Sequence, residues 1–412
     1  MHLVIDIRFY QPEPFGLAVH IRDLFTELMP LFIKDKVFQK VTLIMTKEIV
    51  NLDLQKHLVW WQTVQANPKF CIYFSSCKYY SLLEQTLFLY EIYKLKPDLV
   101  FFFNFNFPIL YNKPFVYQVL DLTIPKTKSK GLKLFLANMV LKQGLKRAKQ
   151  IIFLSKQTTK EAQEFSKLNF FNKEKLDYKP NTPIYPGINP LYLSQPSSNP
   201  QKAEIVGLNS TKRYIQKAKI LKKNLGITKD YYLFVSVWRK YKNIERLVEG
   251  FEIFNEQQQN QYQLVLAGKI DLKYPEIIQR VKTSQQYQQG NIILALEESD
   301  ENLILLQDQA LAYISPSLSE GFGLTLIEAA SRGTLVLCSD IQVFREIIPK
   351  KAAIFFDPYN AEAICQSFKE VIKVTSNPKL IQQILKLGYK NSQKYTWQKA
   401  AKNIYQVLLK SV

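Results

Sequence analysis

The sequence is poor in the residues that most often bind metals or act as acid–base catalysts. It has three histidines and four cysteines among 412 residues. The cysteines are scattered among apolar neighbours, which argues against a disulfide framework or a zinc site: Cys71, Cys77, Cys338 and Cys365. Three histidines leave little material for a histidine-rich metal centre or a Ser-His-Asp triad. We therefore expect chemistry that needs neither a metal nor a cofactor.

Long apolar runs are also missing. Runs such as residues 99–103 fall far short of the roughly 18 residues that a membrane span requires, so no membrane-spanning helix is expected. Residues 3–6 come almost immediately after Met1 and resemble a first strand, without the charged segment, long apolar stretch and cleavage site of a secretory signal. These absences favour a cytoplasmic protein.

Acidic residues are few relative to basic ones, with 35 Asp and Glu against 55 Lys and Arg and a formal net charge of +20. Such a charge favours contact with a polyanion, whether nucleic acid, anionic lipid or phosphorylated ligands, although a lysine-rich proteome would give the same composition. No zinc-finger, RNP-type or basic-zipper signature is present, so nucleic acid is not the expected partner.

The positive charge is concentrated in residues 126–149, which hold seven lysines and Arg147 but no acid. This segment also carries an apolar set at helical spacing: Leu132, Phe135, Leu136, Met139 and Val140. A basic amphipathic helix can lie on an anionic membrane surface. The same apolar residues could instead face the domain core.

The length and the apolar pattern predict two α/β domains. A chain of 412 residues exceeds the size at which one core keeps growing, and short apolar runs alternate with helical patterns in both halves, as in parallel strands joined by helices. Six prolines among Ser and Asn at residues 180–209 indicate a connection between the domains. We expect two Rossmann-like, doubly wound domains facing a central cleft, at residues 1–190 and 191–395. Within this division, residues 191–228 form a linker region and a helix at 396–412 can pack back on the N-terminal domain.

Two carboxylates, Glu320 and Glu328, flank a glycine-bearing loop between two apolar segments, residues 310–315 and 334–339. A strand, a glycine turn, a short helix and a second strand form a βαβ unit, whose ligand crevice lies beyond the carboxyl ends of the strands. The helix N-terminus at Gly323 would offer unpaired N–H donors. Hydrogen bonds from hydroxyls to a charged acceptor such as Glu328 contribute about 1.5–3 kcal/mol each, enough to select a sugar. The spacing alone also allows an acid/base pair.

A second candidate segment gathers cations where an apolar strand ends and a helix begins near Asn243. Its cations are Arg239, Lys240 and Lys242. Together with backbone N–H groups and the positive end of the helix dipole, they would suit a diphosphate. An ordinary solvated turn would give the same pattern.

On these residues the chain resembles the retaining family 4 glycosyltransferases, which have the GT-B fold, and it is closest in pattern to mannosyltransferase-type members. The resemblance includes the two-glutamate motif of residues 320–328, the Lys242-Asn243 pair, residues 264–269, and, in the N-terminal half, residues 5–8, 120–125, 151–155 and the loop at Gly16. Three departures are Thr325 where members usually have proline, Val237 where arginine is common, and Leu120 where histidine often precedes Asp121.

The resemblance implies a GDP- or UDP-sugar as donor. Glu328 would hold the ribose, Glu320 would bind hydroxyls of the transferred sugar, and Lys242 would neutralise the diphosphate. Arg239 or Lys240 would supply the charge missing at Val237, and Gly16 would let the N-terminal loop approach the phosphate closely. The resemblance also places Asp121 on the acceptor side, in the catalytic set with Glu320 and Lys242. The other donor-site positions that it implies are Gly321, Phe322, Gly323, Leu324, Ser236 and Gly268.

The leading hypothesis is a retaining, metal-independent hexosyltransferase that extends a glycan or lipid-linked acceptor in surface polysaccharide assembly, peripherally bound to the inner face of the membrane. The alternative is a catalytically inactive GT-B protein that binds nucleotide sugars or scaffolds a glycan-assembly complex, which Val237 and Leu120 support. An epimerase or phosphorylase fits the two-glutamate motif less well. His20 lies near the Gly16 loop and is interpreted either as a site residue or as a helix residue in a polar environment.

Overall fold

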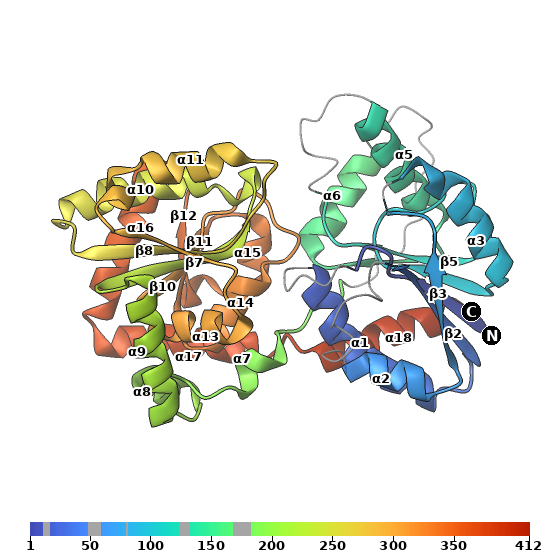
Figure 1. Cartoon of the computed structure of the whole chain (residues 1–412), viewed down its shortest axis with the longest axis horizontal. Helices are drawn as coiled ribbons and strands as arrows, with labels where there is room; N and C mark the ends of the chain where they lie inside the picture. Colours follow the sequence, from blue (N-terminus) through green and yellow to red (C-terminus); the bar gives the residue numbers. More distant parts are fainter. Residues whose placement is uncertain (11–16, 48–58, 80, 123–131, 168–182) are drawn as a thin grey trace. The chain divides into compact units, whose positions relative to one another are not determined.

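The structure, a computed structural model, describes residues 1–10, 17–47, 59–79, 81–122, 132–167 and 183–412 (Figure 1). The chain forms two compact units. The first contains Met1–Gly187 and Tyr395–Val412, and the second contains Ile188–Lys394. In the described part of the chain, no helix combines the length and the apolar character needed to cross a bilayer.

The first unit is built on a six-stranded parallel sheet of strand order β3-β2-β1-β4-β5-β6. The chain reverses its direction of progress between β1 and β4, which pair in parallel with Val4 opposite Val100. In doubly wound sheets, ligands bind at the carboxyl ends of the strands beside such a switch point. The strands are β1 (His2–Asp6), β2 (Lys40–Thr46), β3 (Phe70–Ser75), β4 (Leu99–Phe102), β5 (Phe115–Val119) and β6 (Gln150–Phe153).

Helices cover both faces of this sheet, and the C-terminal helix is one of them. α18 (Trp397–Leu409) packs against α1 (Leu17–Lys34), and its buried Trp397, Ile404 and Leu408 belong to the same apolar core as α1 and α2 (Val59–Ala66). Figure 1 shows the red α18 beside the blue α1. The predicted return of the C-terminal helix to the N-terminal domain is therefore confirmed. A second apolar core contains side chains of α3 (Leu87–Leu95), α5 (Leu132–Arg147) and α6 (Lys156–Lys167). The short helix η3 (Leu82–Gln85) contacts α3.

The second unit repeats the topology, with the strand order β12-β11-β10-β7-β8-β9 in another six-stranded parallel sheet. Its switch point lies between β7 and β10, so the loops that follow these two strands border the expected ligand crevice. Lys242 follows β7 and Glu320 follows β10. The strands are β7 (Asp230–Trp238), β8 (Tyr262–Ile270), β9 (Ile292–Leu296), β10 (Ala312–Ser315), β11 (Leu335–Ser339) and β12 (Ile354–Phe356).

The predicted linker region at residues 191–228 contains helices in the structure. Three helices occupy it, α7 (Pro190–Ser194), α8 (Pro200–Val206) and α9 (Lys212–Leu225), and all belong to the second unit. Pro190 and Pro200 stand in the first turns of their helices, after the capping residues Asn189 and Asn199. Proline suits this position because its missing N–H has no intrahelical partner there. Pro190 and Pro200 therefore mark the starts of helices in this segment.

The remaining helices of the second unit flank its sheet. They are η4 (Lys240–Lys242), α10 (Ile244–Gln257), α11 (Pro275–Thr283), α12 (Gln285–Gln288), α13 (Asp300–Gln309), α14 (Leu324–Ser331), α15 (Gln342–Ile347), η5 (Lys350–Ala352), α16 (Ala361–Thr375) and α17 (Pro378–Ser392). Two parallel sheets flanked by helices confirm the predicted α/β fold with two Rossmann-like domains.

Candidate functional site

Asn243 joins three loops at the carboxyl edge of the second sheet. It has a left-handed backbone conformation (φ 59°) and stands at the start of α10. Its buried side-chain Nδ2 donates to the carbonyl oxygens of Pro316 at 3.1 Å and Pro358 at 2.8 Å. Asparagine tolerates this backbone region better than most residues do. Asn243 therefore has a structural role in joining these loops.

The structure brings Lys242 and Glu320 into direct contact. Lys242 Nζ lies 2.6 Å from Glu320 Oε1, and the Ser317 hydroxyl donates to the same oxygen at 2.7 Å. The side chains of Lys242 and Glu320 are 15% and 14% exposed, so both can still be reached from solvent. Burial alone would lower the pKa of Lys242, but the Glu320 carboxylate and Tyr241 outweigh it and raise this pKa. Lys242 therefore carries a positive charge at neutral pH.

The two other predicted cations pair with different acids. Arg239 Nε donates to Asp271 Oδ2 at 3.1 Å, and Lys240 Nζ lies 2.9 Å from Glu276 Oε1. Both pairs are substantially exposed, so each contributes little to stability. Of the three cations predicted for a diphosphate, Lys242 is the one that contacts Glu320.

The loop between Glu320 and α14 depends on one glycine. Gly323 has a φ of 107°, and a Cβ there would come within 2.7 Å of Phe344 Cε1. Phe322 is 4% exposed and anchors the loop. Gly323 directly precedes α14, and no side chain caps this helix end. The first N–H groups of α14, beginning at Leu324, are therefore placed to bind an anion, with Gly321 and Phe322 in the preceding turn.

Glu328 lies in α14 and is 7% exposed. Strand β10 carries the buried Tyr313, whose hydroxyl donates to Thr325 Oγ1 at 2.7 Å. Burial raises the pKa of Tyr313, and the carboxylates of Glu320 and Glu328 raise it further. Both carboxylates of the motif therefore lie within electrostatic reach of one phenol. Thr325, which stands where the family usually has proline, accepts the hydrogen bond of the Tyr313 hydroxyl.

Gly268 is required by the packing of β7 against β8. Its φ is 114°, and a Cβ at this position would lie 1.9 Å from the carbonyl oxygen of Ser236. Ser236 and Gly268 are paired across the two strands near their carboxyl ends. The close approach of the two strands explains the glycine by itself, and a role of Ser236 and Gly268 in donor binding stays a prediction.

In the first unit, Asp121 follows β5 and is half-buried, next to the buried Leu120. Gly16 lies outside the described residues.

The polar environment considered for His20 is wrong, because its ring is buried against the rings of Phe103 and Trp397. In the described ranges, no three His, Cys, Asp or Glu side chains form a group that could hold a metal ion.

Sequence reasoning missed three residues of this site. Ser317, Tyr313 and Tyr241 surround the predicted residues, but their spacing gave no signal. Ser317 and Tyr313 belong to the strand and loop that lead to Glu320, while Tyr241 adjoins Lys242 and its carbonyl oxygen accepts from the Leu318 N–H at 2.8 Å.

Residues 216–390 match the family model described as glycosyl transferases group 1. The serotype-specific mannosyltransferase WbdA of Escherichia coli is 26% identical over 181 residues, which are 44% of this chain and 22% of WbdA. The O-antigen chain mannosyltransferase B of Escherichia coli is 29% identical over 134 residues, or 32% of this chain and 34% of the relative. This chain thus spans only a minor part of the length of these curated relatives.

Solved structures match over the whole chain. HepE of Anabaena, solved in complex with UDP and glucose, superposes with a TM-score of 0.70 at 13% identity and covers 100% of both chains. A glycosyltransferase of Rickettsia africae has a TM-score of 0.67 at 16% identity, covering 100% of this chain and 98% of its own. The chain therefore has the GT-B fold, and residues 216–390 of its second unit carry the sequence pattern of glycosyl transferases group 1.

Proposed function

We propose that the protein is a retaining, metal-independent family 4 glycosyltransferase. It transfers a hexose, mannose in our proposal, from a GDP- or UDP-sugar to a glycan or lipid-linked acceptor in surface polysaccharide assembly. The match of residues 216–390 to glycosyl transferases group 1 and the two mannosyltransferase relatives support this proposal. The observation that carries it is the contact of Lys242 with Glu320 beside the uncapped start of α14.

This arrangement suits a nucleotide sugar because it combines acceptors for hydroxyls with donors for phosphate. Glu328 would accept hydrogen bonds from the ribose, and Glu320 from the transferred sugar. Lys242 and the first N–H groups of α14 would stabilise the charge that develops on the leaving diphosphate. The departing phosphate oxygen would take the proton of the acceptor hydroxyl. The supporting roles are those that the resemblance implies. Asp121 would lie on the acceptor side, Gly16 would let its loop approach the phosphate, and Arg239 or Lys240 would add positive charge near the diphosphate.

Donor binding tests this assignment. We expect Glu328→Gln to weaken binding of the correct nucleotide sugar by about tenfold to a hundredfold, because one or two charged hydrogen bonds are lost. Lys242→Met should weaken the binding of the free nucleoside diphosphate. Isothermal titration with a panel of GDP- and UDP-sugars measures both effects.

Glu204→Gln and Lys223→Met are matched controls, because both side chains are exposed on helices of the same unit. Unchanged donor binding in both Glu328→Gln and Lys242→Met would show that the donor site is assigned wrongly. A protein that binds nucleotide sugars but transfers no sugar to any acceptor would favour the alternative of an inactive GT-B binding protein.

Peripheral binding to an anionic membrane is a further part of the proposal. In α5, Leu141, Leu145 and Val140 are buried in the core, whereas Phe135 near its start is 63% exposed. The apolar set predicted for this helix is thus divided between the core and the surface. The lysines at residues 126–130 lie outside the described residues.

Sedimentation with phosphatidylglycerol vesicles at low salt tests this part. The wild-type protein should bind, and Phe135→Ser should weaken binding by about tenfold, the order expected for losing part of a buried aromatic side chain. Tyr90→Ser is the control, since Tyr90 is also 63% exposed in the first unit. Equal binding of all three proteins would contradict a membrane role for α5.

A further inference from the structure

Ser317 lies on the loop that leads from β10 to Glu320, and its side chain contacts the Glu320 carboxylate. The Ser317 hydroxyl donates to Glu320 Oε1 at 2.7 Å. Ser317 is 1% exposed, whereas the Glu320 side chain is 14% exposed. The buried hydroxyl can therefore act on a ligand only through Glu320.

The loop that carries Ser317 is fixed on both sides of this residue. The Pro316 carbonyl oxygen accepts from Asn243 Nδ2 at 3.1 Å. The Leu318 N–H donates to the Tyr241 carbonyl oxygen at 2.8 Å. These two bonds join the loop after β10 to the segment after β7, and the two strands themselves are paired. A donor whose own backbone is fixed can hold a partner side chain in one orientation. The fold thus sets the position of the Ser317 hydroxyl.

Glu320 Oε1 has a second partner, Lys242, whose Nζ lies 2.6 Å away. Each oxygen of a carboxylate accepts about two hydrogen bonds, so Lys242 and Ser317 together saturate Oε1. In the described part of the chain, no side chain or N–H donates to the other oxygen, Oε2. The protein therefore fixes Glu320 by Oε1 and leaves Oε2 to accept hydrogen bonds from a ligand.

The two partners of Oε1 would respond differently to a bound diphosphate. Lys242 is a cation on a flexible stem and its side chain is 15% exposed, so the phosphates would compete with Glu320 for its charge. Ser317 is neutral and buried, so its hydrogen bond would stay in place while Lys242 turns towards the phosphates. Ser317 is thus the partner that can hold Glu320 in the liganded site.

We propose that Ser317 is a positioning residue for Glu320. Its hydrogen bond to Oε1 directs Oε2 at the hydroxyls of the transferred sugar, while Lys242 binds the diphosphate. This assignment of ligand groups rests on the proposed function, whereas the hold of Ser317 on Glu320 does not. It follows that Ser317 acts on the sugar part of the donor and Lys242 on the diphosphate part.

The test compares a nucleotide sugar with its free diphosphate. Isothermal titration uses UDP-glucose and GDP-mannose together with UDP and GDP. Ser317→Ala should weaken binding of the nucleotide sugar by about 5- to 10-fold, as for the loss of one hydrogen bond to a charged group. Binding of the free diphosphate should stay unchanged. A general structural defect would weaken both ligands to the same extent, and that result would overturn the proposal.

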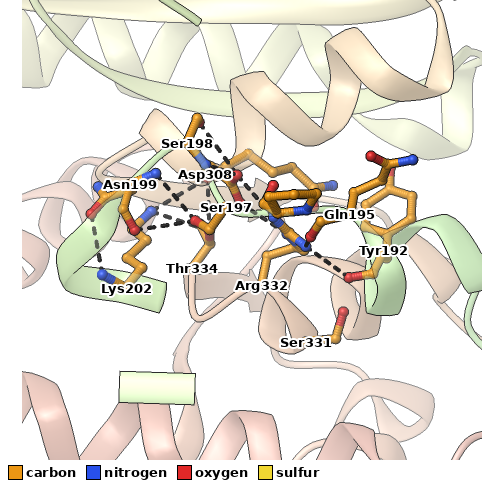
Figure 2. A network of polar contacts seen from close by, with 12 residues as sticks. Tyr192, Gln195, Ser197, Ser198, Asn199, Lys202, Asp308, Ser331, Arg332 and Thr334 are labelled. Carbon is orange, nitrogen blue, oxygen red and sulfur yellow. Dashed lines mark hydrogen bonds and ion pairs between the residues drawn. The ribbon is translucent and has the colours of Figure 1, made fainter. Parts of the chain in front are cut away.

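Ser331→Ala is the matched control. Ser331 is also 1% exposed, and its hydroxyl also donates at 2.7 Å, but its acceptor is the backbone carbonyl oxygen of Glu328. Ser331 ends α14 and precedes Arg332, which forms a buried ion pair with Asp308 (Figure 2). This pair fixes the end of the helix without the Ser331 hydroxyl. The control should therefore bind both ligands as the wild-type protein does, and a selective loss of sugar binding in it would contradict a special role for Ser317.

The carboxyl ¹³C resonance of Glu320, identified by its absence in Glu320→Gln, tests the contact itself without any ligand. It should move in Ser317→Ala and keep its position in Ser331→Ala. An unmoved resonance in Ser317→Ala would show that Ser317 does not position Glu320. If the wild-type protein binds neither the nucleotide sugars nor UDP and GDP, the proposed function fails, while the resonance still decides whether Ser317 holds Glu320.

Discussion

Replacement of Arg8 by methionine is expected to lower the free energy of unfolding by about 3–5 kcal/mol at pH 8, the usual cost of removing one partner of a buried ion pair. Arg8 Nε and Nη2 donate to the two oxygens of Asp6 at 2.9 and 3.0 Å. Nη2 also donates to Glu84 at 2.7 Å. Asp6 and Glu84 are each 2% exposed. Without the guanidinium, two buried carboxylates would face each other.

The loss should depend on pH because Glu84 titrates near neutrality. Burial raises the pKa of Glu84 from its ordinary 4.5 to about 7, Arg8 opposes the rise, and Asp6 adds to it. Between these values the folded protein keeps a proton that the unfolded chain has released. This contribution to stability is therefore fully present below pH 4.5 and is lost as the pH rises through 7. Since Glu84 is protonated at about pH 5, Arg8→Met should cost less there than at pH 8.

Urea unfolding at the two pH values measures this difference. Arg147→Met is the matched control, because the half-buried Arg147 donates to the carbonyl oxygens of Ile109 and Tyr111. Its replacement should reduce stability by a similar amount at both pH values. Equal losses for Arg8→Met at pH 5 and pH 8 would contradict the part assigned to Glu84.

Both sheets could be predicted from the sequence because their central strands are buried on two faces and therefore appear as nearly continuous apolar runs. Strands β10 and β11 lie within the predicted segments 310–315 and 334–339. Strand β3 was missed. It stands at the edge of its sheet, and most of its residues are only partly buried, although residues 70–74 form a continuous apolar run in the sequence.

The sequence suggested some residues of the candidate site, such as Lys242 and Glu320, but not their neighbours Ser317, Tyr313 and Tyr241, and it could not predict which side chains pair. Lys242 and Glu320 are 78 residues apart, and their contact depends on how the loops after β7 and β10 fold at the switch point. The same holds for Arg8 and Glu84, separated by 76 residues. Local spacing places Asp6 beside Arg8, but only the fold brings Glu84 to the same guanidinium. Sequence spacing therefore identifies chemical groups better than it identifies partners.

Replacement of His20 by phenylalanine is expected to make the first unit more resistant to acid. The His20 ring on α1 lies 4.9 Å from the Trp397 ring and 5.6 Å from the Phe103 ring, edge-on in both cases. Burial lowers the pKa of His20 from 6.5 to about 3. Between these values the unfolded chain binds a proton that the folded protein does not. Stability that is fully present above pH 6.5 is therefore lost as the pH falls towards 3.

At pH 4 this loss amounts to about 3 kcal/mol, since each pKa unit corresponds to about 1.4 kcal/mol. Phenylalanine keeps a ring between Phe103 and Trp397 but cannot bind the proton, so the fall in unfolding free energy from pH 7 to pH 4 should shrink by this amount. Trp397 is the first residue of α18, so lowering the pH should reduce the amide protection factors of this helix in the wild-type protein. The reduction should be smaller in His20→Phe. Identical pH profiles for the two proteins would show that other groups cause the acid sensitivity.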